Sequence, residues 1–287
     1  MLTKNNWIKV DWDGKCPRDR VENLRLEFTQ KASAIPASWE AACDATALDI
    51  ASKYDNLYVG MSGGADSEHI ADILYRNKIP FTPIIIEWVG FATIAEDQSN
   101  VENQYAYYWC KKRNITPIIM RLGRDIFTDG SYETILNKIK PRLQYGATMM
   151  YVSQEVERLG GNLVTGMQLE YFPDAQFGKL EKIPAGYKGF VANESDFYFE
   201  ADNPDRHPWA FYYWSPEMMA ATVAYWNTTT TMTETKAELY GTPYRPKLFN
   251  GEFIRRLPPE MYCRNKYGTI DCVLLGDKEE LLAKLLG

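Results

Sequence analysis

One segment, residues 57–78, constrains the fold more than any other part of the chain. It opens with a short apolar run, residues 57–61, which is typical of a buried strand. The run ends in Ser62-Gly63-Gly64, and residues 66–78 then have the apolar spacing of a helix. A buried strand that passes through a glycine-rich turn directly into a helix indicates the start of a βαβ unit.

The same alternation of strand and helix signals continues along the centre of the chain. Further strands are predicted at residues 81–88, 116–120 and 162–166, and helices at 39–51 (capped by Ser38), 94–113, 131–141 and 146–159. Strands that alternate with helices of this length favour a parallel sheet covered by helices on both faces. We therefore predict an α/β fold, an open and mainly parallel sheet flanked by helices.

The pattern changes at both ends of the chain, which suggests three parts. Residues 1–36 alternate apolar and polar side chains around Asp13-Gly14 and are predicted to form an N-terminal β-hairpin extension. Residues 37–166 are the α/β core. Residues 167–287 lose a clear period and are predicted to form an irregular C-terminal region that binds the substrate. Within that region, helical patterns occupy residues 216–225, 233–240 and 277–286.

Composition and charge exclude several classes of protein. Apolar residues make up 45% of the chain and charged residues 24%, so neither a disordered nor a collagen-like chain is expected. The net charge of −6 argues against broad attraction to nucleic acid, although contact with nucleic acid through a local basic surface stays open. No apolar run approaches the roughly 20 residues that span a bilayer, and no secretion signal opens the chain. We expect a cytoplasmic protein that does not contact a membrane.

The loop after the first core strand is suited to binding an anion. Backbone N–H groups at such a turn point outward, and the positive end of the helix dipole adds to them. The hydroxyls of Ser62 and Ser67 can supply further donors. Asp66 lies within the same loop, where its charge is unfavourable unless a cation accompanies the anion. The pattern therefore predicts a phosphate or pyrophosphate site that also contains Mg²⁺.

The six residues Ser62-Gly63-Gly64-Ala65-Asp66-Ser67 resemble the signature loop of the PP-loop ATP pyrophosphatases. The resemblance covers about residues 37–240 and is strongest at the loop. It implies an adenine nucleotide alpha-hydrolase-like fold with ATP at the carboxyl ends of the strands. It also implies ATP and Mg²⁺ as cofactors. In the reaction usual for this superfamily, an acceptor oxygen attacks the α-phosphate, pyrophosphate leaves, and nitrogen or sulfur then displaces AMP.

The resemblance also implies roles for individual residues. The implied nucleotide-binding residues are Ser62, Gly63, Gly64, Asp66, Ser67, Glu87, Trp88 and Gly166. The implied metal ligands are Asp66, Glu170 and Asp174, although Glu170-Tyr171 stands where the synthetase branch has Asp-Glu. The catalytic candidates are Asp66, Lys236, Arg245 and Lys247. Of these, the cations Lys236, Arg245 and Lys247 would counter the negative charge that develops as pyrophosphate leaves.

Two alternatives to this reaction stay open. Tyr240-Gly241-Thr242-Pro243-Tyr244 resembles a segment of the phosphoadenylylsulfate reductases, which act on a sulfonucleotide through a cysteine. Cys263 and Cys272 are the cysteines that could serve, and the sequence does not decide between them. The other alternative is a nucleotide-binding module without catalysis. The expected partners are a small-molecule or nucleotide acceptor and, as an assembly, a homodimer.

Other conspicuous residues are interpreted as packing residues. His69 lies early in the helix after the loop and is predicted to fill the core or the helix surface. The aromatic run over residues 209–214 is predicted to be core, although one ring could stack on a base. His207 is left open between a site role and a structural one. The five cysteines contain no C-x-x-C pair and are expected to be free thiols.

Overall fold

The structure is a computed structural model, which describes residues 7–12, 24–89, 94–127, 129–130, 134–135, 144–173, 186–193, 210–242 and 272–287. Its centre is a four-stranded sheet in the order β5-β4-β3-β6, in which every neighbouring pair is parallel. The strands are β3 (Leu57–Gly60), β4 (Phe81–Trp88), β5 (Ile118–Leu122) and β6 (Asn162–Val164). The predicted α/β fold with a parallel sheet is therefore confirmed, and strand β5 begins two residues later than predicted.

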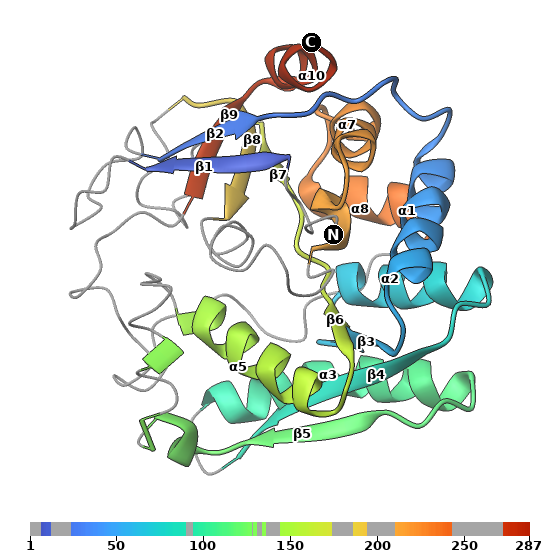
Figure 1. Ribbon diagram of the computed structural model, residues 1–287, viewed down its shortest axis with the longest axis vertical. Coiled ribbons are helices and arrows are strands. Elements are labelled where there is room, and N and C mark those ends of the chain that lie inside the picture. Colours follow the sequence, from blue (N-terminus) through green and yellow to red (C-terminus); the bar gives the residue numbers. More distant parts are fainter. Residues whose placement is uncertain are drawn as a thin grey trace.

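Helices cover both faces of this sheet (Figure 1). The helices are α1 (Trp39–Lys53), α2 (Ala65–Arg76), α3 (Ile94–Lys112) and α5 (Gln144–Arg158). Successive strand residues point to opposite faces. Accordingly, Ile85 packs in the cluster formed with α1, α2 and α3, and Ile84 in the cluster formed with α5. The predicted helix over residues 131–141 lies almost entirely outside the described residues.

Helix ends follow the capping signals in the sequence. Ser38 caps α1 by accepting a hydrogen bond from the backbone N–H of Ala41. Ser215 caps α7 (Pro216–Tyr225), whose first position is a proline as predicted. Helix α8 (Met232–Tyr240) begins with a capping box between Thr231 and Glu234. It ends at Gly241, whose φ of 61° is a left-handed conformation that glycine adopts without strain.

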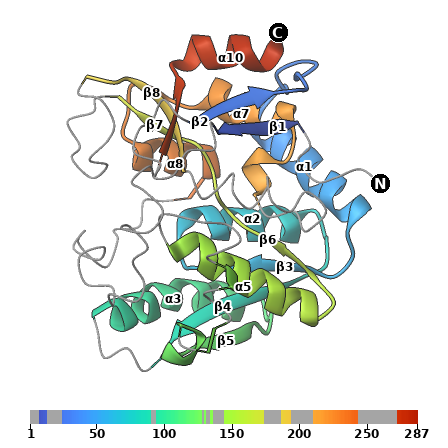
Figure 2. The ribbon, with the colours of Figure 1, turned by 60° about the vertical axis from the view of Figure 1, so that its left-hand side comes forward.

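Two antiparallel sheets lie away from the central one, above it in the views of Figures 1 and 2. The first pairs β1 (Ile8–Trp12) with β2 (Leu24–Phe28), as expected for the N-terminal extension. The Asp13-Gly14 turn itself lies outside the described residues. The second sheet has the order β7-β8-β9 and comprises β7 (Glu170–Phe172), β8 (Gly189–Asn193) and β9 (Cys272–Gly276). The C-terminal region thus contains a sheet that was not expected from the sequence pattern, as well as the predicted helix α10 (Lys278–Leu286).

The C-terminal region packs on the parallel sheet through the segment that follows β6. Thr165 forms a parallel bridge with Ala210 and accepts a hydrogen bond of 3.1 Å from the N–H of Phe211. One hydrophobic cluster runs from Trp7 through Leu163 to Leu281 and so crosses the predicted boundary at residue 166. The three-part division stays a prediction. Of the helices in the described ranges, none has the length and apolar character required to cross a bilayer.

Candidate active site

The phosphate loop, residues 61–67, joins β3 to α2 at the carboxyl edge of the parallel sheet. The N–H of Met61 donates to the carbonyl of Ile84 on β4 at 2.7 Å, which fixes the start of the loop. Gly64 is the N-cap of α2 and brings no side-chain cap to the helix. The first N–H groups of a helix have no acceptor within the helix. The loop therefore presents backbone donors and the positive end of a helix dipole to an anion.

Gly63 meets two conditions that only glycine satisfies easily. Its φ of 78° is left-handed, and a Cβ built on it would lie 2.0 Å from the carbonyl oxygen of Glu102 on α3. A side chain at this position would therefore be strained and would also clash with backbone. The Gly-Gly pair of the signature lets the loop lie directly against α3.

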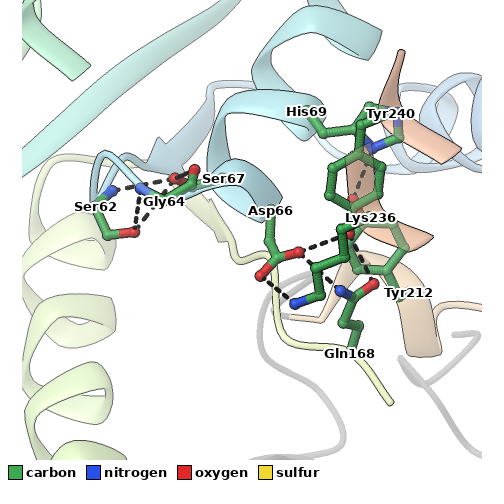
Figure 3. A network of polar contacts seen from close by, with 9 residues as sticks. All are labelled: Ser62, Gly64, Asp66, Ser67, His69, Gln168, Tyr212, Lys236 and Tyr240. Carbon is green, nitrogen blue, oxygen red and sulfur yellow. Dashed lines mark hydrogen bonds and ion pairs between the residues drawn. The ribbon is translucent and has the colours of Figure 1, made fainter. Parts of the chain in front are cut away.

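The two serine hydroxyls of the loop have different surroundings (Figure 3). The buried Ser67 Oγ donates to the carbonyl of Gly64 at 3.0 Å and accepts from the N–H of Ser62 at 3.2 Å. The exposed Ser62 Oγ accepts from the N–H of Gly64 at 3.3 Å and also lies 3.3 Å from the Oγ of Ser67. Ser67 thus holds the loop in shape, and Ser62 is the hydroxyl that is accessible to a ligand.

Asp66, in the first turn of α2, binds three donors from distant parts of the chain (Figure 3). Its Oδ2 lies 2.9 Å from Nζ of Lys236 on α8, which forms an ion pair. Its Oδ1 accepts from Nε2 of Gln168 at 2.7 Å and from the hydroxyl of Tyr240 at 2.6 Å. The structure therefore brings together two predicted catalytic residues, Asp66 and Lys236. Gln168 and Tyr240 are additions to the predicted set.

Lys236 places a positive charge beside Asp66. The Lys236 side chain is 12% exposed and that of Asp66 is 31% exposed, so water screens this pair only in part. Both carboxylate oxygens accept from donors of this chain, and the predicted role of Asp66 as an Mg²⁺ ligand stays a prediction. Within the described ranges, no three His, Cys, Asp or Glu side chains gather in a way that could bind a metal ion. Glu170 begins β7, and Asp174 lies outside the described residues.

A stack of buried rings lies behind the Asp66 contacts. The His69 ring is 4.1 Å from the Tyr240 ring at an interplanar angle of 14°. Nδ1 of His69 forms a hydrogen bond of 2.8 Å with the hydroxyl of Tyr212. Burial, followed by the charge of Arg76, lowers the pKa of His69 to about 3, so the ring is neutral at physiological pH. His69 is buried as predicted, and it has a polar contact that the packing interpretation does not include.

Gly166 lies against the phosphate loop. A Cβ added to it would lie 3.0 Å from both the carbonyl carbon and Cβ of Asp66, and 3.1 Å from the N–H nitrogen of Ser67. Its lack of a side chain lets the segment after β6 pass close to the start of α2 and places Gln168 within reach of Asp66. The predicted part of Gly166 in nucleotide binding stays a prediction.

Glu87 and Trp88 end the neighbouring strand β4 at the same edge of the sheet. Oε1 of Glu87 accepts from the Tyr107 hydroxyl at 2.5 Å, and Oε2 accepts from Nε of Arg121 at 3.0 Å. These two hydrogen bonds, that of Tyr107 first, lower the pKa of Glu87. Glu87 is therefore ionised at neutral pH, and its predicted place beside adenine and ribose stays a prediction. Trp88 is half-buried beside it.

Several predicted residues cannot be placed in the site. Arg245, Lys247, Cys263 and His207 lie outside the described residues. Cys272 begins β9, but its side chain is not among those described. The free thiols that are described, Cys43 and Cys110, are buried, and burial raises the pKa of both, that of Cys110 to about 11. Neither thiol has the character of a nucleophile.

A separate hollow of about 580 Å³ lies at the opposite edge of the sheet. Its lining includes Tyr75, Arg76 and Phe81, at the end of α2 and the start of β4, and it contains no residue of the phosphate loop. Open α/β sheets bind ligands at the carboxyl ends of their strands. The phosphate loop is therefore the better candidate for the active site.

Comparison with known proteins leaves the function to be argued from the site. No protein-family model matches the chain, and no curated protein sequence matches it. Among solved structures, an NMN synthetase from Francisella tularensis is 14% identical at a TM-score of 0.34, with 73% of this chain and 89% of that one covered. An NH3-dependent NAD synthetase from Campylobacter jejuni subsp. jejuni NCTC 11168, in complex with the nitrate ion, is 13% identical at a TM-score of 0.32. The match covers 45% of this chain and 56% of that synthetase. Neither likeness is close enough to support an argument about function.

Proposed function

We propose that this protein is an ATP-dependent enzyme that adenylylates an acceptor oxygen and releases pyrophosphate. The observation that carries the proposal is the ion pair between Lys236 and Asp66 in the first turn of α2. It places a lysine ammonium group beside a loop of backbone donors that is suited to a phosphate group. The adenylylated acceptor would then take up nitrogen or sulfur, as the resemblance of the loop implies.

Charge development explains the need for Lys236 in this reaction. The acceptor oxygen forms a bond to the α-phosphorus, and the bond from that phosphorus to the bridging oxygen breaks. The electron pair of the broken bond leaves with pyrophosphate, whose negative charge grows. Preorganised donors lower the barrier where such charge develops. The N–H groups of the loop and the Lys236 ammonium group would supply them.

Asp66 orients Lys236 in this proposal and takes no proton from the substrate. An ammonium group has three N–H donors. One is engaged by Asp66 at 2.9 Å, which leaves two for phosphate oxygens. The loop also lacks the lysine of a Gly-x-x-x-x-Gly-Lys-[ST] sequence, which would engage the β- and γ-phosphates for γ-phosphoryl transfer. Both features favour cleavage between the α- and β-phosphates.

Magnesium enters this proposal only as part of the substrate, Mg²⁺-ATP. Asp66 is engaged by three donors, and its role as a metal ligand stays a prediction. Glu170 and Asp174 stay predictions as metal ligands, as do Glu87, Trp88 and Gly166 as nucleotide contacts. A nucleobase or nucleotide acceptor and a homodimer also stay predictions. No contact in the described residues favours the reductase alternative over this reaction.

Product analysis tests the proposed reaction. The purified protein is incubated with Mg²⁺-ATP and a panel of nucleobases, nucleosides, nucleotides and small carboxylic acids, and nucleotides are separated by ion-exchange chromatography. With a suitable acceptor, AMP and pyrophosphate should form in equal amounts. Accumulation of ADP and phosphate would contradict the proposal. Reduction of a sulfonucleotide that depends on Cys263 or Cys272 would favour the reductase alternative.

Lysine variants connect the products to the site. Lys236→Met should slow formation of AMP and pyrophosphate by about 100-fold, the usual effect of removing one donor that stabilises developing charge. Lys53→Met is the matched control, because Lys53 also forms an ion pair, at 2.6 Å with Asp49 on α1. Its rate should equal that of the wild type.

A further inference from the structure

We infer that Tyr240 is a positioning residue whose hydroxyl, together with Gln168, holds the Asp66 carboxylate in the orientation that directs Lys236 toward the phosphate loop. The catalytic consequence of this inference rests on the proposed function, but its geometric claim does not. Tyr240 is the first residue of the Tyr-Gly-Thr-Pro-Tyr segment, to which the proposed reaction gives no role.

The spacing on α8 brings two side chains to one carboxylate. Lys236 and Tyr240 are four residues apart and therefore lie on the same face of the helix. Nζ of Lys236 contacts Oδ2 of Asp66 at 2.9 Å, and the Tyr240 hydroxyl contacts Oδ1 at 2.6 Å. A carboxylate held at both oxygens cannot rotate without breaking one of these contacts. By holding Oδ1, the hydroxyl of Tyr240 restrains the rotation of the carboxylate and so keeps Oδ2 facing Lys236.

Gln168 completes the arrangement from another segment. Its Nε2 donates to Oδ1 of Asp66 at 2.7 Å, and its Oε1 lies 2.9 Å from the Tyr240 hydroxyl (Figure 3). Gln168 is itself buried. Because the amide contacts both partners, it fixes the position of the hydroxyl relative to the carboxylate. The carboxylate is therefore oriented by two parts of the chain, α8 and the segment after Gly166.

The stacked rings fix Tyr240 in turn. Its ring lies 4.1 Å from that of His69 and 6.4 Å from that of Tyr212, nearly parallel to both. The ring is buried, so it has little room to change rotamer. Burial raises the pKa of Tyr240 well above its usual value, and the hydroxyl keeps the proton that it donates.

A purely structural role is the competing explanation, in which Tyr240 only packs α8 against α2. Tyr240→Phe separates the two, because it keeps the ring in the stack and removes only the hydroxyl. Tyr225→Phe is a matched control. The Tyr225 hydroxyl on α7 donates to the carbonyl of Pro36 at 2.7 Å and so has a hydrogen-bond partner other than Asp66.

The reactivity of the Lys236 amine reports its position without any substrate. Each variant is pulsed with acetic anhydride, and acetylation of Lys236 is measured by mass spectrometry relative to Lys53, which is also ion-paired. Asp66→Asn removes the ion pair and should raise Lys236 acetylation most. Tyr240→Phe and Gln168→Met should each raise it by several-fold, and Tyr225→Phe should leave it at the wild-type value. Thermal melts identify any variant that does not fold. If Tyr240→Phe does not fold, Gln168→Met tests the same geometry.

The outcomes separate this inference from the proposed function. Wild-type acetylation in folded Tyr240→Phe, or in folded Gln168→Met, would overturn the positioning role whatever the protein binds. Wild-type acetylation in Asp66→Asn would overturn it too, because the ion pair would then not exist in solution. Inorganic pyrophosphate should protect Lys236 in the wild type if the proposed function is right. Absence of protection would contradict the proposed function and leave the positioning role standing.

Discussion

Lys236 and Asp66 are 170 residues apart in the sequence, yet Nζ of Lys236 lies 2.9 Å from Oδ2 of Asp66. This contact joins helix α8 to the first turn of α2, where the phosphate loop ends. An acidic residue at an anion-binding loop is unfavourable by itself, and the lysine compensates its charge. In the proposed reaction, the pair would place the ammonium group of Lys236 beside the loop, where the leaving group gains negative charge.

Asp66→Asn should abolish turnover and leave the fold intact. The amide keeps the shape of the side chain but removes the charge that orients Lys236. We expect a fall in ATP consumption of at least about 100-fold. Because the pair is only partly buried, the melting temperature should fall by no more than about 2–4 °C. Circular dichroism and an assay for AMP measure the two effects, and full activity in the variant would contradict the role given to Asp66.

Gly166→Ala should destabilise the protein, whereas Gly60→Ala should not. The added Cβ at Gly166 would lie 3.0 Å from two atoms of Asp66, and backbone would have to shift to admit it. We expect a loss of about 1–3 kcal/mol in the free energy of unfolding. At Gly60 the nearest atom lies 3.8 Å away, an ordinary contact. Urea denaturation compares the two variants, and equal midpoints would show that the close approach at Gly166 does not exist.

His69 should make the protein less stable as the pH falls from about 6.5 toward 3. Burial lowers the pKa of His69 to about 3 in the folded state, against 6.5 for the free side chain. Between these values the unfolded chain binds a proton that the folded chain does not, so stability decreases as pH falls, by at most about 1.4 kcal/mol per pH unit. His69→Asn keeps a polar atom near Nδ1 and does not titrate. From pH 7 to pH 4, the midpoint of urea denaturation should fall less steeply in this variant than in the wild type. The same dependence of the midpoint on pH in both proteins would refute the prediction.

The strand-loop-helix elements of the core could be predicted because their signals are local. The apolar run at residues 57–61, the two glycines and the helical spacing after Asp66 lie next to one another in the sequence. Strand β9 lacks such a signal. It is a short apolar run that could equally belong to a helix, and its partner β8 begins at Gly189. Pairing over such a distance depends on packing that no local pattern records.

The sequence predicts candidate site residues one by one, but it does not predict how they are arranged. Asp66 and Lys236 are both predicted to act at the pyrophosphate site, yet nothing in the sequence shows that they touch. The spacing of Lys236 and Tyr240 on one helix was the available signal that Tyr240 belongs with them. Gln168 could have been suspected from its place two residues after Gly166. The contact of His69 with Tyr212 joins positions that are 143 residues apart and has no sequence signal.

Binding of inorganic pyrophosphate tests the central claim most directly, because it needs neither the acceptor nor turnover. Isothermal titration calorimetry compares wild type, Lys236→Met and the matched Lys53→Met. We predict saturable binding of pyrophosphate by the wild type and by Lys53→Met. Affinity should be about 10- to 100-fold weaker in Lys236→Met, as expected for the loss of one hydrogen bond between charged groups. No binding to the wild type, or equal affinities in all three proteins, would contradict a pyrophosphate site formed by the loop and Lys236.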